Sequence, residues 1–312
     1  MRALIVHSVP TAPTVAETPA PRPEAGELLV KVEASSVNGF DAATAAGYLQ
    51  GMMEHRFPLV LGKDFAGTVE AVGEDVTGFA AGDAVFGVVA KAFLGTGSLA
   101  EYVTVPAGYG VARIPAGVSV SDAGALGLAG AAAVDSLDAI DPKAGETVLI
   151  AGATGGVGAI AVQYAAARGA RVIATARQGG HADFIRSLGG EDVHVVDYTA
   201  DLGAQVRAIA PGGVDAALHL AGDGGSLADL VAPGGRIAST LGFGPEAVEG
   251  RELTAVSVMA DANTATLERL AADVAAGRLR VPVTATYTLD DAPQAFADFG
   301  AGALGKLAVA CG

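Results

Sequence analysis

Residues 147–158, Thr-Val-Leu-Ile-Ala-Gly-Ala-Thr-Gly-Gly-Val-Gly, decide the fold of this chain. A short β-branched run ends in glycines, and an apolar helical pattern follows. A strand that turns into a helix N-terminus presents unpaired N–H groups and a positive dipole end, which together bind a pyrophosphate. Glycine permits the tight turn and the approach of phosphate oxygens, although the glycines alone also fit a purely structural turn. The stretch predicts a dinucleotide-binding loop formed by Gly152, Thr154, Gly155, Gly156, Val157 and Gly158.

The strand after this loop carries the signal for the type of dinucleotide. The predicted strand Arg171–Ala176 leads into Arg177 without the acidic residue that binds a ribose 2′-hydroxyl in NAD sites. Arg177 stands where a guanidinium binds a 2′-phosphate beside Ala176, and His181 and Tyr198 are expected on the same rim. The pattern favours NADP(H) over NAD(H). The alternative is that Arg177 is a solvated loop cation.

The composition excludes several classes of function. The 312-residue chain has a formal net charge of −15, which disfavours nucleic acid and anionic lipid as partners. The apolar runs are too short to span a bilayer and the N-terminus lacks a signal-peptide pattern, so we expect a cytoplasmic protein without a membrane partner. The single cysteine, Cys311, and five scattered histidines predict no metal site.

The order of the predicted elements indicates two domains. Residues 1–120 contain short strands between Pro, Gly and Asp turn signals. A helix is expected over Ser121–Ile140, with Ser121-Asp122 as its cap. From Thr147 onward strands and helices alternate, which is typical of a parallel sheet covered on both faces. We predict an α/β fold in which a Rossmann-type, doubly wound parallel sheet (121–261) is inserted into a β-rich domain built from 1–120 and 262–312.

The whole chain resembles the zinc-free quinone oxidoreductase branch of the medium-chain dehydrogenase/reductase superfamily. The resemblance implies a GroES-like β-rich domain, a reductase and no zinc, because the zinc enzymes have His-Glu where Lys63-Asp64 stand here. Two departures are Gly130–Ala133, where the family often has a threonine, and Gly39, where proline is common. The motifs that carry the resemblance are Ala151–Gly158, Leu61–Val69 with Val72-Gly73, Ser36-Val37-Asn38 with Asp41, Arg186–Gly189, Asp197-Tyr198, Pro233–Arg236 and Gly305-Lys306.

The resemblance implies reduction of an acceptor that is already electron-poor. A quinone accepts hydride without a metal because the charge delocalises onto a carbonyl oxygen. Candidate hydrogen-bond donors to that oxygen are Asn38 and Tyr48, with Asp41 orienting its neighbours. The alternatives are that Asn38 caps a helix over residues 39–46, that Tyr48 is an interface aromatic and that Lys63 is a surface cation.

Two further segments are expected near the cofactor. Leu241-Gly242-Phe243 follows the predicted strand Arg236–Thr240 and would line the nicotinamide pocket, or else form a glycine loop with a buried Phe. Gly305-Lys306 would close over the phosphates, or else begin the last strand.

We therefore predict an NADPH-dependent, zinc-free quinone reductase. A reductase of α,β-unsaturated carbonyls is the second candidate, and a nonenzymatic NADPH-binding or sensor protein is the third. A homodimer is expected through an apolar strand near Ala255–Met259, which would extend a sheet across a two-fold axis.

Overall fold

The computed structural model describes residues 1–190 and 192–312. The chain forms two compact units, and the predicted α/β class with a parallel sheet is confirmed. The β-rich unit comprises Met1–Ala129 and Ala262–Gly312, and the parallel-sheet unit comprises Gly130–Asp261. The predicted first boundary, at 120/121, lies before this division.

The parallel-sheet unit is built on six parallel strands in the order β13-β12-β11-β14-β15-β16. The strand order reverses between β11 and β14, and ligands of doubly wound sheets bind at this kind of switch point, outside the carboxyl ends of the strands. The strands are β11 (Thr147–Ala151), β12 (Arg171–Thr175), β13 (Val193–Val196), β14 (Val214–His219), β15 (Val231–Ser239) and β16 (Leu253–Ser257).

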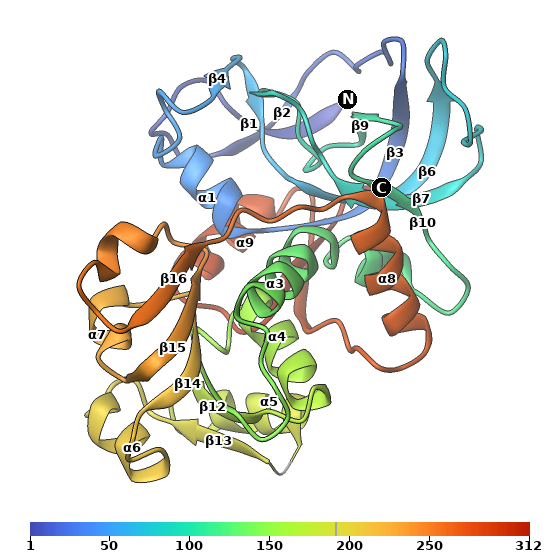
Figure 1. Cartoon of the computed structure of the whole chain (residues 1–312). Coiled ribbons are helices and arrows are strands. Elements are labelled where there is room, and N and C mark those ends of the chain that lie inside the picture. The colour runs from blue at the N-terminus through green and yellow to red at the C-terminus, as the bar shows by residue number, and fades with distance from the viewer. Residues whose placement is uncertain (191) are drawn as a thin grey trace. The chain divides into compact units, whose positions relative to one another are not determined.

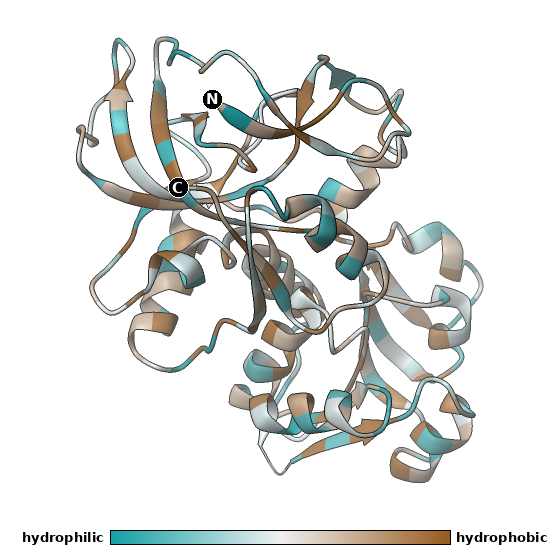
Figure 2. Ribbon diagram, turned by 180° about the vertical axis from the view of Figure 1, so that it is seen from behind, coloured by the Kyte–Doolittle hydropathy of each residue, from teal (hydrophilic) through white to brown (hydrophobic). Residues whose placement is uncertain are grey.

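Helices cover both faces of this sheet. In Figure 1, α4 and α5 lie on one side of the strands and α6 and α7 on the other. The helices carry both hydrophobic and hydrophilic bands, because one face packs on the sheet while the other meets water (Figure 2). Residues such as Leu149, Ile173 and Ile237 form the buried core beneath α6 and α7. The helices are α4 (Gly156–Ala167), α5 (Gly180–Gly189), α6 (Leu202–Ile209), α7 (Gly224–Ala228) and the short 3-10 helix η1 (Pro245–Val248).

The β-rich unit contains a seven-stranded sheet, which includes the path β10-β7-β6-β3-β18-β17 with β9 also paired to β3. Smaller sheets are formed by β2-β1-β5 and by β4-β8. The strands are β1 (Arg2–Val6), β2 (Thr14–Glu17), β3 (Glu27–Ser36), β4 (Glu54–His55), β5 (Leu59–Val60), β6 (Asp64–Val72), β7 (Ala84–Val88), β8 (Phe93–Leu94), β9 (Tyr102–Pro106), β10 (Val111–Arg113), β17 (Val283–Thr288) and β18 (Lys306–Ala310).

Strand β18 joins the two sequence segments of this unit. It lies between β3 and β17, antiparallel to the first and parallel to the second. Its residue Val309 is fully buried in one core with Val30 and Phe65 of strands β3 and β6. The other elements of this unit are α1 (Gly39–Ala45), α2 (Val120–Ala123), α8 (Thr264–Ala275) and α9 (Ala292–Gly300).

The helix predicted over Ser121–Ile140 is in fact two helices, α2 and α3 (Gly127–Ile140). The N-cap is Ser119, whose side chain accepts a hydrogen bond from the Asp122 N–H at 3.0 Å, rather than Ser121-Asp122. The first helix ends at Gly124, where a Cβ would lie 2.8 Å from the Ala34 backbone of β3. Close packing on a strand therefore interrupts a pattern that looks continuous in sequence.

Candidate functional site

The predicted dinucleotide loop connects β11 to α4 through a glycine turn. Gly152 has a φ of +85°, which favours glycine, and a Cβ on Gly158 would lie 2.2 Å from the Gly152 carbonyl oxygen. A Cβ on Gly155 would meet no atom of the loop closer than 3.6 Å. The fold therefore requires glycine at 152 and 158, whereas a Cβ on Gly155 would make only an ordinary van der Waals contact with the loop at the N-terminus of α4. Such a helix start, with its first N–H groups unpaired inside the helix, suits an anion.

Thr175 fixes this turn to the neighbouring strand. Its Oγ1 accepts a hydrogen bond from the Gly152 N–H at 3.0 Å and donates one to the Ile150 carbonyl at 3.3 Å. The side chain is buried at the end of β12. Sequence reasoning did not single out Thr175, because a threonine near the end of a buried strand is ordinary.

The residues predicted to form a rim beyond β12 partly come together. Arg177 donates a hydrogen bond from Nε to the Tyr198 hydroxyl at 2.8 Å, and its guanidinium lies 5.8 Å from that ring's centroid. Both side chains are exposed. His181 lies in the first turn of α5, and among the described residues its buried Nδ1 has no hydrogen-bond partner. Ala176 is buried beside them, and its N–H donates to Val196.

The segment Leu241-Gly242-Phe243 is held by a buried pair that sequence reasoning missed. Ser239 Oγ, at the end of β15, accepts hydrogen bonds from the Leu241 and Phe243 N–H groups at 3.0 and 3.2 Å. The same oxygen is 2.9 Å from His219 Nδ1, at the end of β14. Because that oxygen already accepts two hydrogen bonds, its own proton goes to Nδ1.

This arrangement fixes the imidazole tautomer and leaves one side of the loop open. His219 therefore carries its proton on Nε2, which donates to the Gly222 carbonyl at 3.1 Å. The Phe243 ring meets the imidazole edge-on, with ring centroids 5.8 Å apart, while Leu241 is 56% exposed. The loop thus combines a packed aromatic ring with an apolar side chain in solvent.

The β-rich unit holds a second polar cluster, centred on the fully buried Asp64. Oδ2 of Asp64 accepts hydrogen bonds from Ser36 Oγ at 2.7 Å and from Asn38 Nδ2 at 2.9 Å, and it forms an ion pair with Lys306 Nζ at 3.2 Å. Oδ1 accepts the Leu128 N–H at 2.7 Å. Asp64 is therefore a structural anion that joins four segments of chain.

Two predicted catalytic residues, Asn38 and Asp41, belong to this cluster. The Asn38 side-chain amide donates to Asp64 through Nδ2 and accepts a hydrogen bond from Lys306 through Oδ1. The Asn38 backbone N–H donates to Asp41 Oδ2 at 2.9 Å. It also stands at the N-cap of α1. The Asn38 amide is thus engaged with Asp64 and Lys306 rather than with the N–H groups of α1, and it has little left to offer a substrate.

Asp41 is buried close to a second carboxylate. Burial raises the pKa of Asp41 to about 7, and the nearby Asp64 charge adds to this rise. The hydrogen bond from the Asn38 N–H and the positive charges of Lys306 and Lys63 oppose it. Near neutral pH the Asp41 carboxyl is therefore present in both protonation states.

Tyr48 and Lys306 lie in quite different surroundings. Tyr48 follows α1 and is 78% exposed, so it does not share the buried cluster. Lys306 begins β18, as one of its two predicted readings expects. Its ammonium group donates to Val37 O at 3.3 Å and to Asn38 Oδ1 at 2.5 Å in addition to pairing with Asp64. All three of its hydrogens are used, so a phosphate contact by Gly305-Lys306 finds no support here.

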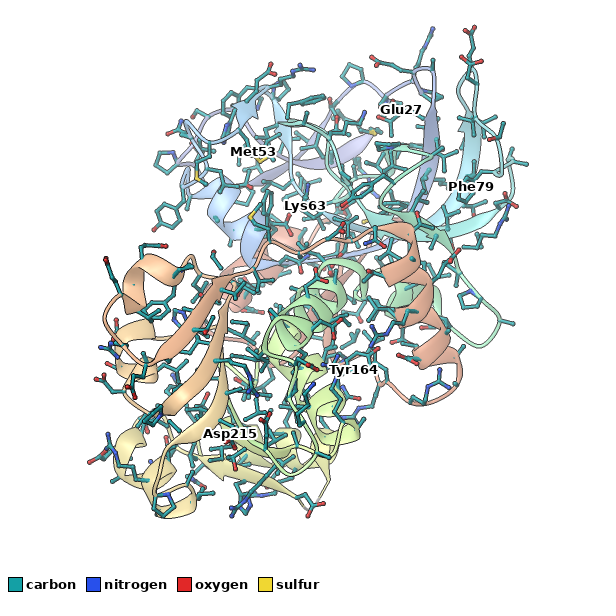
Figure 3. The ribbon with its side chains drawn as sticks, in the orientation of Figure 1. Glu27, Met53, Lys63, Phe79, Tyr164 and Asp215 are labelled. Carbon is teal, nitrogen blue, oxygen red and sulfur yellow. The ribbon has the colours of Figure 1, made fainter. Side chains whose placement is uncertain are left out.

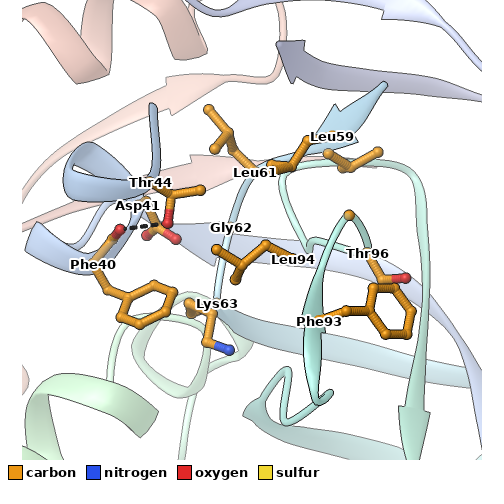
Figure 4. Close-up of a pocket in the computed structure, with 12 residues that line it drawn as sticks. Phe40, Asp41, Thr44, Leu59, Leu61, Gly62, Lys63, Phe93, Leu94 and Thr96 are labelled. Carbon is orange, nitrogen blue, oxygen red and sulfur yellow. Dashed lines mark hydrogen bonds between the residues drawn. The ribbon is translucent and has the colours of Figure 1, made fainter. Parts of the chain in front are cut away.

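Lys63, labelled in Figure 3, is not the surface cation that sequence allowed as an alternative. It is partly buried and lines a pocket of the β-rich unit with Phe40, Asp41 and Thr44 (Figure 4). Its Nζ donates to the Val89 carbonyl and lies 4.9 Å from the Phe40 ring centroid. Burial lowers the pKa of Lys63, while the neighbouring Asp41 and Asp64 oppose that effect.

The donor set does not fit a zinc ion. Within residues 1–190 and 192–312, no three His, Cys, Asp or Glu side chains are grouped as metal ligands would be. Cys311 is buried, with its Sγ 3.8 Å from the Ser98 carbonyl, and Asp64 already accepts four hydrogen bonds. In the same described part of the chain, no helix has the length and apolarity needed to cross a membrane.

Two family models match the sequence. One describes the alcohol dehydrogenase GroES-like domain and matches residues 24–116; the other describes a zinc-binding dehydrogenase and matches residues 191–309. A chloroplast envelope quinone oxidoreductase homolog of Arabidopsis thaliana is 34% identical over 213 residues, which is 66% of this chain and 62% of that protein. A chloroplastic quinone oxidoreductase of Triphysaria versicolor gives the same identity and coverage. The chain thus spans less than two thirds of these relatives.

Solved structures match over the full length. A quinone oxidoreductase from Coxiella burnetii has a TM-score of 0.87 and 28% identity, covering 100% of this chain and 99% of that one. A mycobacterial protein solved in complex with NADPH has a TM-score of 0.86 and 29% identity, covering 99% of this chain and all of that one.

Proposed function

Because this chain belongs to the medium-chain dehydrogenase/reductase superfamily, we propose that it is an NADPH-dependent reductase of quinones that works without a metal. The observation that carries the proposal is the open helix start at Gly155 together with the exposed Arg177–Tyr198 pair. Relatives and similar structures named quinone oxidoreductase support the choice of acceptor.

The residues of the parallel-sheet unit fit NADPH. The N–H groups of Gly156, Val157 and Gly158 would bind the pyrophosphate, and Gly155 allows its oxygens to approach. Arg177 would bind the 2′-phosphate, with Tyr198 holding the guanidinium in place and His181 offering a further polar atom. The loop Leu241–Phe243 would line the nicotinamide side.

When bound, NADPH supplies a hydride, and the protein's own residues do the rest. A quinone that receives a hydride develops negative charge on an oxygen, so the protein must supply a hydrogen-bond donor and exclude water. The Asn38 amide is already hydrogen-bonded to Asp64 and Lys306, and Tyr48 is exposed. Both residues are therefore poor candidates for the hydrogen-bond donor to that oxygen. The poor fit of the donor set to zinc supports direct reduction of an acceptor that needs no Lewis acid.

Two measurements test the proposal. Stopped-flow oxidation of bound NADPH by a panel of quinones should be fast, and a panel of α,β-unsaturated carbonyls should react more slowly. If the unsaturated carbonyls react about a hundredfold faster than the quinones, the proposal that quinones are the acceptors is wrong. If no electrophile turns over, the chain is a nonenzymatic NADPH-binding protein.

The cofactor assignment has its own test. Removal of one charge-assisted contact of about 1.5–3 kcal/mol should weaken NADPH binding to Arg177→Ala by roughly tenfold to a hundredfold. Calorimetry should show NADH binding nearly unchanged. Arg207→Ala, an exposed arginine of the same unit, is the matched control. Equal losses for both dinucleotides would contradict the 2′-phosphate contact.

We also propose a homodimer formed through β16, which is the edge strand of the parallel sheet. Its Val256 is 37% exposed, and Met259, just beyond the strand, is 88% exposed. An unpaired edge with exposed apolar side chains is a template for pairing with a second copy. Val256→Lys should convert the dimer to monomers in light scattering; an unchanged dimer would place the interface elsewhere.

A further inference from the structure

Two lysines lie near the buried carboxylates of the β-rich unit, and their ammonium groups differ in how many hydrogen-bond acceptors they contact. Lys306 is 2% exposed, and its three hydrogens are taken by Val37, Asn38 and Asp64. Lys63 directly precedes the buried Asp64 but donates to a single carbonyl, that of Val89. Among the described residues no second hydrogen-bond acceptor contacts Lys63. The ammonium group of Lys306 therefore has an acceptor for each of its hydrogens, whereas Lys63 has hydrogens that could be donated to a bound molecule.

The pocket beside Lys63 is small and has both apolar and polar walls. Its walls include Leu59, Leu61, Phe93 and Leu94, and the volume open to the centre of a water molecule is about 10 Å³. That volume is about enough for one water molecule, hence for one acceptor oxygen. The lysine is the sole basic residue among those that line this pocket. An oxygen entering there would meet a partly buried cation, whose charge water screens less than it screens a fully exposed one.

Phe40 and the nearby carboxyls keep this cation in place. The Phe40 ring lies 4.9 Å from Nζ, and the ring face attracts an ammonium group. Asp41, which lines the same pocket, interacts electrostatically with Lys63. Its mixed protonation near neutral pH makes it a local source of a proton.

We propose that Lys63 is a catalytic residue that donates a hydrogen bond, and then a proton, to the acceptor oxygen that becomes negative during reduction. The inference rests on the proposed function. The hydride brings two electrons to the acceptor, an N–H bond of Lys63 breaks and an O–H bond forms on the acceptor. The resulting neutral amine regains a proton from water or from Asp41. Atoms and charge balance with the dinucleotide as the reductant.

The first test measures how Lys63 affects the ionisation of a bound phenol, and it requires no turnover. The probe is 4-nitrophenol, whose anion resembles the singly deprotonated reduced acceptor and absorbs differently from the neutral phenol. The wild-type protein should lower the pKa of bound 4-nitrophenol by about one unit, because an ammonium group favours the charged form. Lys63→Met should abolish this shift and Lys63→Arg should keep most of it. A probe whose ionisation does not move in the wild type would overturn the proposal.

The second test is kinetic. Loss of one donor to a developing oxyanion typically costs a hundredfold or more, so kcat of Lys63→Met should fall about a hundredfold. NADPH affinity, measured by calorimetry, should stay within about twofold. Lys31→Met, an exposed lysine of the same unit, is the matched control and should behave as the wild type.

The outcomes separate the two proposals. If the wild type reduces quinones and Lys63→Met matches it within about twofold, the role of Lys63 is wrong while the proposed function stands. If the wild type reduces no electrophile, the proposed function fails, and the 4-nitrophenol measurement alone decides whether Lys63 binds an oxyanion. If Lys63→Met does not fold, the wild type and Lys63→Arg still give that measurement.

Discussion

The buried Asp41 should make the stability of this protein depend on pH. In the folded chain its pKa rises from the ordinary 3.8 to about 7, whereas the unfolded chain keeps the ordinary value. Between these two pKa values the folded state holds a proton that the unfolded state has released. Stability is then lost as pH rises, by about 1.36 kcal/mol per unit. The proton on Asp41 therefore contributes about 4 kcal/mol to the free energy of unfolding below about pH 4. This contribution is lost above about pH 7.

Asp41→Asn isolates this effect, because an amide cannot ionise and its oxygen still accepts the hydrogen bond from the Asn38 N–H. Urea unfolding of both proteins should be followed by circular dichroism between about pH 5 and about pH 8. Between about pH 5 and about pH 7, the free energy of unfolding of the wild type should fall by roughly 2–3 kcal/mol relative to that of the variant. Above about pH 7 the difference between the two free energies should stay constant.

Two controls make the result decisive. Glu70→Gln changes an exposed carboxyl on β6 of the same unit and tests for a general effect of lost charge. A ¹³C spectrum of labelled aspartate, with Asp41→Asn used for assignment, reads the carboxyl directly. A constant difference across this pH range, or a signal from Asp41 that titrates near pH 4, would refute the reasoning.

Four further substitutions test the positions described above. Gly158→Ala places a Cβ 2.2 Å from the Gly152 oxygen and should cost about 1–3 kcal/mol in urea unfolding, whereas Gly155→Ala should unfold as the wild type does but bind NADPH at least about tenfold more weakly by calorimetry. Equal stability of the two would show that the turn is not tight. Lys306→Met leaves Asp64 as a buried charge without its cation and should cost about 3–5 kcal/mol; a loss below about 1 kcal/mol would mean that the pair is not buried in solution. Ser239→Ala removes the acceptor of the Leu241 and Phe243 N–H groups, so their hydrogen exchange should accelerate about tenfold, and unchanged exchange would assign the loop another anchor.

Sequence reasoning located the parallel sheet well because its signals are local. The β-branched run forms β11 and the helical pattern after the glycine turn forms α4, as predicted, and β12 ends one residue before the predicted Ala176. The hydrophobic period and the turn residues are both read over a few positions. The α2–α3 break was missed because the cause, the Ala34 backbone of β3, is distant in sequence.

The polar cluster could not be predicted for the same reason. Asp64 and Lys306 are 242 positions apart, and neither residue type signals a buried ion pair by itself. Asn38 and Asp41 were noticed through a family motif, but the motif does not reveal that other side chains already occupy the Asn38 amide. The pair His219–Ser239 escaped notice because its members end two different strands.

The position of β18 sets an order of events during synthesis. Residues 130–261 emerge from the ribosome as one uninterrupted stretch and can fold there while translation continues. The sheet of the β-rich unit lacks an interior strand until residues 306–310 are made. Residues Ala34–Ser36 of β3, which pair with β18, therefore keep an unpaired edge in the nascent chain, whereas Glu27–Lys31 can already pair with β9. That short edge is a site for association with other unfinished chains until β18 covers it.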